Sequence, residues 1–149
     1  MRPQDRYENY AELCESKREG IDFQIHVIER TESTAVIATH GGQIEPGTFQ
    51  IAAAIADDSY SLYCFQGLRS RPHSDLHITS TSFDEPRCLR LIAKCDLVVS
   101  VHGLRGKHEA VQVGGLDISV RDAICQKLQE VGFTAEIVTR GPYRCSLQE

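Results

Sequence analysis

Three features that would assign a chain to a class at once are missing from this sequence of 149 residues. No apolar run approaches the ~20 residues that a membrane span requires. The N-terminus lacks the apolar core of a secretory signal. Positive charge is not in excess, since the formal net charge is -5, and nucleic-acid binding depends on neutralising phosphates. We therefore expect a cytoplasmic protein, able to act outside the cell after lysis, with neither nucleic acid nor membrane as a partner.

Paired cysteine spacing is also missing. The chain has six cysteines, but no two of them form a CxxC motif, so neither a zinc knuckle nor a redox motif is indicated. Without an export signal, the cysteines are expected to be reduced thiols rather than a disulfide framework. The six positions are Cys14, Cys64, Cys88, Cys95, Cys125 and Cys145.

The remaining composition is that of an ordinary folded protein. Hydrophobic residues make up 41% of the chain and charged residues 25%, which argues against disorder. The length suits one domain with one core, so we expect a single domain over residues 1–149. The oligomeric state is left open.

Periodicity predicts strands that alternate with helices. Two strands, 34–39 and 96–101, are apolar without alternation, which is typical of strands covered on both faces. They are expected to be central and neighbouring in a three-layer α/β fold, with a mostly parallel or mixed sheet and helices on both faces. The other expected strands are 23–30, 61–65, 76–79, 110–113 and 133–139, and the expected helices are 5–18, 46–56, 86–94 and 118–131.

A histidine followed by glycine ends each of these two apolar strands. His40 is followed five residues later by Glu45, and His102 ends the second strand. Ligands bind beyond the carboxyl ends of parallel strands, and two imidazoles with one carboxylate are a catalytic zinc set with an open fourth position. The same residues also fit an interpretation in which His40 merely ends a strand and Glu45 merely caps a helix.

Positive side chains follow the second histidine closely. Arg105 and Lys107 would place charge beside the metal and could bind a carboxylate of the substrate. A solvated loop explains them equally well. The other histidines are weaker candidates: His26 is expected on the polar face of a strand, His77 at the start of a strand, and His73 and His108 in loops.

Four segments resemble the zinc-dependent poly-γ-glutamate hydrolases of bacteriophages and their bacterial relatives. They are THGGQIEPGTFQIAAAIA, LHITSTSFDEPRCL, VVSVHGLRG and VGGLD, and the likeness covers roughly residues 7 to 140. The resemblance implies a zinc carboxypeptidase-like fold and a Zn²⁺ cofactor held by His40, Glu45 and His102. It also implies cleavage of γ-glutamyl amide bonds in poly-γ-glutamate.

The resemblance weakens at the C-terminus, where the family supplies an acid expected to act as general base. Here the chain stops at TRGPYRCSLQE, so we expect a domain shortened at this end. Glu149 could stand in as the catalytic base, and Glu109 is the alternative. Two other functions stay open: a zinc amidase or deacylase acting on a small amide, and a catalytically silent metal-binding domain.

Overall fold

The computed structural model describes residues 5–69 and 75–139. The chain divides into two compact units, Met1–Gly103 and Leu104–Glu149, and each is described by itself. The expected single domain stays a prediction. In the described part of the chain, none of the helices has both the length and the apolar character of a membrane span.

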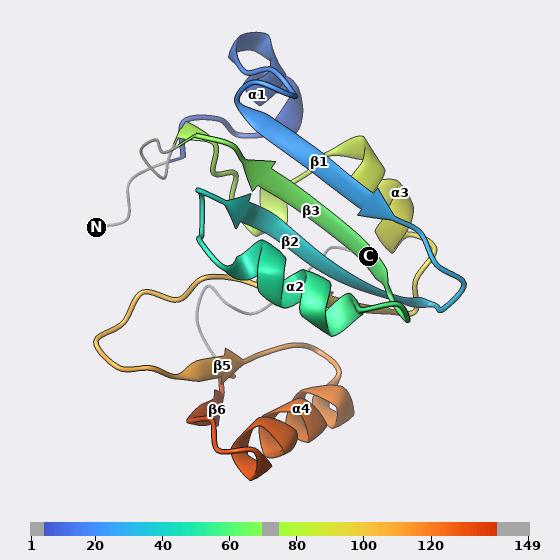
Figure 1. Ribbon diagram of the computed structural model, residues 1–149, viewed down its shortest axis with the longest axis vertical. Coiled ribbons are helices and arrows are strands. Elements are labelled where there is room, and N and C mark those ends of the chain that lie inside the picture. The colour runs from blue at the N-terminus through green and yellow to red at the C-terminus, as the bar shows by residue number, and fades with distance from the viewer. Residues whose placement is uncertain (1–4, 70–74, 140–149) are drawn as a thin grey trace. The chain divides into compact units, whose positions relative to one another are not determined.

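The first unit is built on a four-stranded mixed sheet in the order β1-β3-β2-β4. Figure 1 shows β3 between β1 and β2. Its strands are β1 (Phe23–Ile28), β2 (Thr34–Gly42), β3 (Ser61–Gly67) and β4 (Leu97–Ser100). Strand β2 runs parallel to both β3 and β4, whereas β1 runs antiparallel to β3. The carboxyl ends of β2 and β4 therefore lie at one edge of the sheet.

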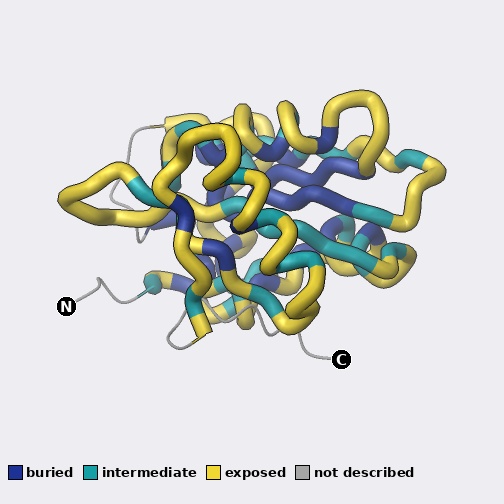
Figure 2. Tube along the Cα trace, turned by 90° about the horizontal axis from the view of Figure 1, so that it is seen from below, coloured by how far each residue is buried: buried dark blue, intermediate teal, exposed yellow. Residues whose placement is uncertain are grey.

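Strand β2 is covered on both faces, as its continuous apolar sequence predicts. Ala35 and Ile37 belong to one buried cluster, while Val36 and Ala38 belong to another. Successive side chains of a strand point to opposite faces, so these two clusters are the two faces of the sheet. Figure 2 shows the buried stretches of the chain in dark blue, and strand β2 is among them.

Helices close both faces. Helices α1 (Tyr10–Ser16) and α3 (Pro86–Ile92) contribute Leu13 and Leu91 to the cluster that contains Ile37. Helix α2 (Thr48–Ala56) packs on the opposite face. The predicted layered fold with helices on both sides of a mixed sheet is confirmed.

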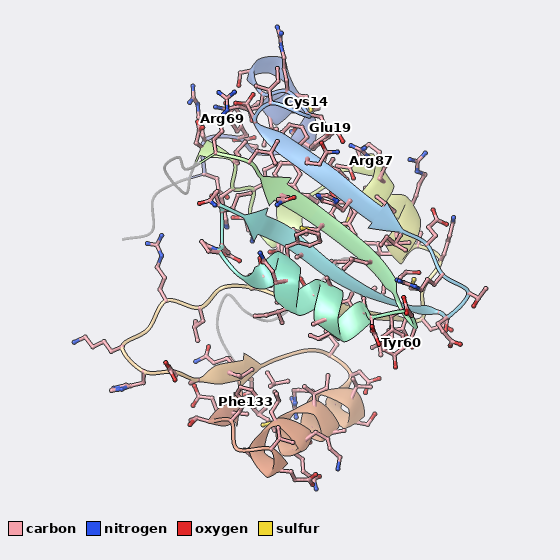
Figure 3. The ribbon with its side chains drawn as sticks, viewed as in Figure 1. Cys14, Glu19, Tyr60, Arg69, Arg87 and Phe133 are labelled. Carbon is pink, nitrogen blue, oxygen red and sulfur yellow. The ribbon has the colours of Figure 1, made fainter. Side chains whose placement is uncertain are left out.

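Helix α3 begins where the DEP sequence places it. The buried Glu85 caps the helix by accepting hydrogen bonds from the backbone N–H groups of Arg87 (3.0 Å) and Cys88 (2.9 Å). The Arg87 side chain spans Glu85 and Glu19, with a 2.8 Å ion pair to Glu19 (Figure 3). This bridge ties the start of α3 to the loop before β1.

Two expectations about the sheet are wrong. Strand β4 is at the end of the order among the described strands, and its residues are half-buried, although β2 is its neighbour as predicted. Residues 76–79 form no strand. Their polar groups bond side chains instead: Asp5 binds His77 and Thr79, and His40 donates to the Ile78 carbonyl. Backbone groups engaged in this way cannot join a sheet ladder.

The second unit has a small core of its own. Strands β5 (Val111–Val113) and β6 (Ala135–Ile137) pair in parallel, and helix α4 (Ile118–Glu130) packs against them. Asp117 caps α4 by accepting from the N–H of Val120 at 3.0 Å. Within residues 104–139, the buried side chains are those of Val113, Cys125 and Ala135.

The cysteines that the structure describes are all free thiols, as expected. Cys64 and Cys88 are buried, and burial raises the pKa of each to about 12. Cys14 is exposed. Cys145 lies outside the described residues.

Candidate metal site

The three predicted ligands meet at one edge of the sheet in the first unit. His40 lies near the carboxyl end of β2, Glu45 in the turn that follows, and His102 two residues beyond β4. Because β2 and β4 are parallel neighbours, their ends deliver the two histidines side by side. His40 is buried and His102 is exposed.

Their donor atoms form a nearly regular triangle. The Nδ1 atoms of His40 and His102 are 3.2 Å apart, and the Glu45 Oε2 atom is 3.5 Å from the first and 3.7 Å from the second. Tetrahedral bonds of about 2.0–2.2 Å to zinc separate two ligand atoms by about 3.3–3.6 Å. One metal ion therefore fits these three atoms without rearrangement.

The opposite nitrogen of each imidazole is engaged elsewhere. His40 Nε2 donates to the Ile78 carbonyl at 2.8 Å, and His102 Nε2 lies 2.8 Å from the Ser100 hydroxyl. A carbonyl oxygen can only accept, so the proton of a neutral His40 sits on Nε2 and its lone pair on Nδ1. Metal-binding histidines are typically held in this way through their other nitrogen.

The Glu45 carboxylate is held ionised. Burial acts to raise its pKa, but the contacts with the His102 and His40 imidazoles and the hydrogen bond from the Gly103 N–H outweigh burial and place the pKa well below its ordinary value. The Gly103 N–H donates to Glu45 Oε2 at 2.8 Å. An ionised carboxylate is the form that a metal ligand requires.

The glycines after His40 allow the turn to form. A β-carbon on Gly41 would overlap the Cys64 sulfur, and one on Gly42 would overlap the Gly67 carbonyl. Gly42 also has a φ of 65°, which non-glycine residues rarely adopt. The register between β2 and β3 shifts between Ala38 and Gly41. Such bulges redirect side chains next to functional sites.

Helix α2 begins later than predicted. It starts at Thr48 rather than at residue 46, because Gly47 adopts a left-handed conformation with a φ of 96°. The Thr48 hydroxyl donates to the Glu45 carbonyl at 2.9 Å. The turn thus closes on itself before the helix starts, and Glu45 is held by the histidines and Gly103 rather than by the first helical turn.

His77 is the neighbour that the sequence pattern missed. Its ring stacks on His40 with 4.1 Å between centroids, and its Nδ1 lies 2.6 Å from Asp5 Oδ1. His40, Glu45 and His77 also bring one donor atom each within 4.8 Å of one another. We favour His102 as the third ligand because its triangle with His40 and Glu45 is tighter and matches a tetrahedron. A signal existed, since His77 lies inside one of the segments that carry the resemblance.

The other four predicted residues lie outside the described part of the first unit. Arg105, Lys107 and Glu109 are exposed and belong to the second unit. Glu149 lies outside the described residues. Their roles in substrate binding and proton transfer stay predictions.

Comparison with known proteins now decides the family. The sequence profile of the poly-gamma-glutamate hydrolase family matches residues 7–148. The chain belongs to this family. Its fold also matches a solved structure of a bacteriophage poly-gamma-glutamate hydrolase, with a TM-score of 0.87 and 35% identity over 91% of this chain and 67% of the other. The zinc carboxypeptidase-like mixed fold is thereby confirmed.

Relatives from Bacillus subtilis (strain 168) are similar over most of the chain. The SPbeta prophage-derived UPF0714 protein YoqZ is 39% identical over 91% of this chain and 48% of its own length, and UPF0714 protein YndL is 38% identical over 91% and 53%. A solved structure described as zinc-free apo YndL matches with a TM-score of 0.86 and 37% identity, covering 92% of this chain and 67% of that one. The chain spans about half the length of the curated relatives that it matches.

Proposed function

We propose that His40 Nδ1, His102 Nδ1 and Glu45 Oε2 hold one zinc ion and leave its fourth position open. The observation that carries the proposal is the triangle of 3.2, 3.5 and 3.7 Å between these atoms. Two imidazoles, one carboxylate and an open position are the set that catalytic zinc uses. The description of the YndL structure as zinc-free supports zinc as the metal in this family.

A buried cysteine lies beside the turn that follows His40. Cys64 lies against Gly41 on the neighbouring strand, but it is fully buried and its pKa is raised to about 12. In the metal-free chain this side chain is therefore a neutral thiol at physiological pH, whereas a metal binds the thiolate form. The proposed donor set is the two imidazole nitrogens and the Glu45 oxygen, and such a set favours catalysis over a structural role.

The proposed reaction is hydrolysis of γ-glutamyl amide bonds in poly-γ-glutamate. When bound, zinc supplies Lewis acidity that polarises a carbonyl and lowers the pKa of water toward ~7. The chain's contribution is to keep two lone pairs and one carboxylate aimed at a single point. Glu45 is the one anion among the three donors, so a divalent ion keeps net positive charge, which attracts a substrate rich in carboxylates.

Two further roles complete the proposal. Arg105 and Lys107 bind carboxylates of the polymer and concentrate positive charge locally on a chain whose net charge is -5. Glu149, with Glu109 as the alternative, accepts the proton of the attacking water and passes it to the leaving amine. The poly-gamma-glutamate hydrolase description of the family supports this substrate.

The test compares polymer length over time for γ-linked and α-linked polyglutamate. Wild-type protein loaded with zinc is expected to shorten the γ-linked polymer and to leave the α-linked polymer intact. Wild-type protein treated with a chelator and the His40→Ala variant should shorten neither polymer. His26→Ala is the matched control, because His26 belongs to the same unit but bonds Gln66 at 2.7 Å. Turnover of small amides alone would favour the amidase reading. Bound zinc without any turnover would favour a silent metal-binding domain.

A further inference from the structure

We propose that Asp5 is a positioning residue for the metal site, acting through residues 77–79 to fix the orientation and tautomer of His40. This inference rests on the proposed function, in which His40 is a zinc ligand. It assigns a task to the segment before helix α1, 35 positions before His40 in the sequence.

Both Asp5 oxygens bind this one segment. Oδ1 lies 2.6 Å from His77 Nδ1, and Oδ2 accepts from the Thr79 N–H and the Thr79 hydroxyl, each at 2.7 Å. Three bonds from one carboxylate thus fix the residues on either side of Ile78. Residues 76–79 form no strand, so a side chain takes the place of sheet pairing here.

The clamped residues in turn hold His40 in two ways. The buried Ile78 accepts from His40 Nε2 through its carbonyl at 2.8 Å, and the His77 ring stacks on the His40 ring at 4.1 Å with planes 24° apart. The first contact sets which nitrogen carries the proton, and the second sets the ring plane. Together they direct the Nδ1 lone pair toward Glu45 and His102.

A separate ion pair anchors the start of the same segment. The buried Lys17 donates to both oxygens of Asp75 at 2.8 Å, and Arg6 binds Asp75 at 2.9 Å. These contacts do not involve Asp5. A change at Asp5 should therefore leave residues 75–79 attached to the fold, but it should weaken the hydrogen bond and the ring stacking that orient His40.

The first experiment measures zinc affinity of the full chain by competition with a chelator. Asp5→Asn keeps the shape of the side chain but cannot bind all three partners as the carboxylate does, and it is expected to weaken zinc binding by about 10–100-fold, the usual effect of removing a partner of a metal ligand. Asp84→Asn is the matched control. Asp84 accepts from the Tyr10 N–H at 2.7 Å in the same unit and should not affect zinc affinity.

The second experiment needs no metal. Nitrogen chemical shifts of the imidazoles in the metal-free chain report the tautomer of His40, which should be a single form protonated on Nε2 in the wild type and a mixture in Asp5→Asn. If Asp5→Asn proves unfolded, Thr79→Val removes only the hydroxyl partner and should shift both readouts in the same direction by less.

The two proposals fail separately. A wild type that binds no zinc, yet shows a His40 tautomer that depends on Asp5, overturns the zinc proposal and supports the positioning role. A folded Asp5→Asn variant with wild-type zinc affinity and a wild-type tautomer overturns the positioning role, whatever the wild type binds.

Discussion

His40 and His102 end neighbouring parallel strands with the same His-Gly sequence, yet the molecule holds them differently. His40 extends a strand in which residues 35–41 are all buried, and its side chain is 2% exposed. His102 follows a strand of four half-buried residues, and its side chain is 29% exposed. One candidate ligand is part of the core, whereas the other is presented from the edge of the described sheet.

The difference shows how a single site divides its tasks. The first half of the site is His40 with the residues that hold it. The Ile78 carbonyl and the stacked His77 ring fix its imidazole, and the two glycines that follow it leave no room for a side chain. The second half is His102 with its neighbours. The Ser100 hydroxyl contacts the His102 imidazole, and the Gly103 N–H donates a hydrogen bond to Glu45. We expect changes at the first half to affect both folding and metal binding, and changes at the second half to affect metal binding alone.

The largest expected effect on stability comes from the glycines after His40. Gly42→Ala combines overlap with the Gly67 carbonyl and a left-handed backbone, so it should reduce the free energy of unfolding by about 2–4 kcal/mol. Gly20→Ala is the control, because its φ is 80° but a β-carbon there meets open space. It should lose only about 1–2 kcal/mol in urea unfolding. Equal losses would show that the close approach at Gly42 is unimportant.

Next come the histidines themselves. His40→Ala should remove stoichiometric zinc, because the fixed half of the site is lost. His102→Ala should keep a wild-type melting temperature in the metal-free state and bind zinc at least about 100-fold more weakly, more than the loss of an indirect partner costs. Elemental analysis and chelator competition measure both. Full zinc content in His40→Ala would contradict the assignment.

Acid should affect the first unit through Glu45. Its folded pKa is depressed, so its contribution to stability is present above the ordinary carboxyl pKa of about 4.3 and is lost as pH falls from there toward the folded pKa. The difference in the free energy of unfolding between the metal-free wild type and Glu45→Gln should therefore become smaller below pH ~4. Glu32→Gln, at an exposed position, serves as the matched variant in urea unfolding at several pH values. A difference that stays constant from pH 7 to acid would show that Glu45 is not held ionised by its neighbours.

The smallest expected effect is at the partner of His102. Ser100→Ala removes the hydroxyl 2.8 Å from His102 Nε2, and zinc affinity should fall by about tenfold. Because His102 sits at the exposed half, the unfolding free energy should stay within about 0.5 kcal/mol of wild type. A large loss of stability would place His102 in the structural core instead.

The same contrast explains what the sequence could predict. His40 and His102 were found because each follows an uninterrupted apolar run, and parallel neighbours bring their ends together. Glu45 was found by its spacing from His40. These are signals of local sequence and of sheet geometry, and the structure places all three side chains together.

What the sequence could not predict depends either on contacts between distant segments or on the backbone conformation of a single residue. Asp5 meets His77 across 72 positions, and no periodicity marks such a pair. Residues 76–79 look like a strand because they alternate, but their polar groups are taken by Asp5 and His40. The late start of α2 follows from the left-handed Gly47, which a helix pattern alone does not reveal.

X-ray absorption at the zinc edge of the zinc-loaded full chain, with His102→Ala alongside, identifies the atoms bound to the metal. We expect two imidazole nitrogens and one carboxylate oxygen at about 2.0–2.2 Å in the wild type, and one imidazole fewer in the variant. Sulfur at about 2.3 Å, or an unchanged imidazole count in His102→Ala, would contradict the proposed ligand set.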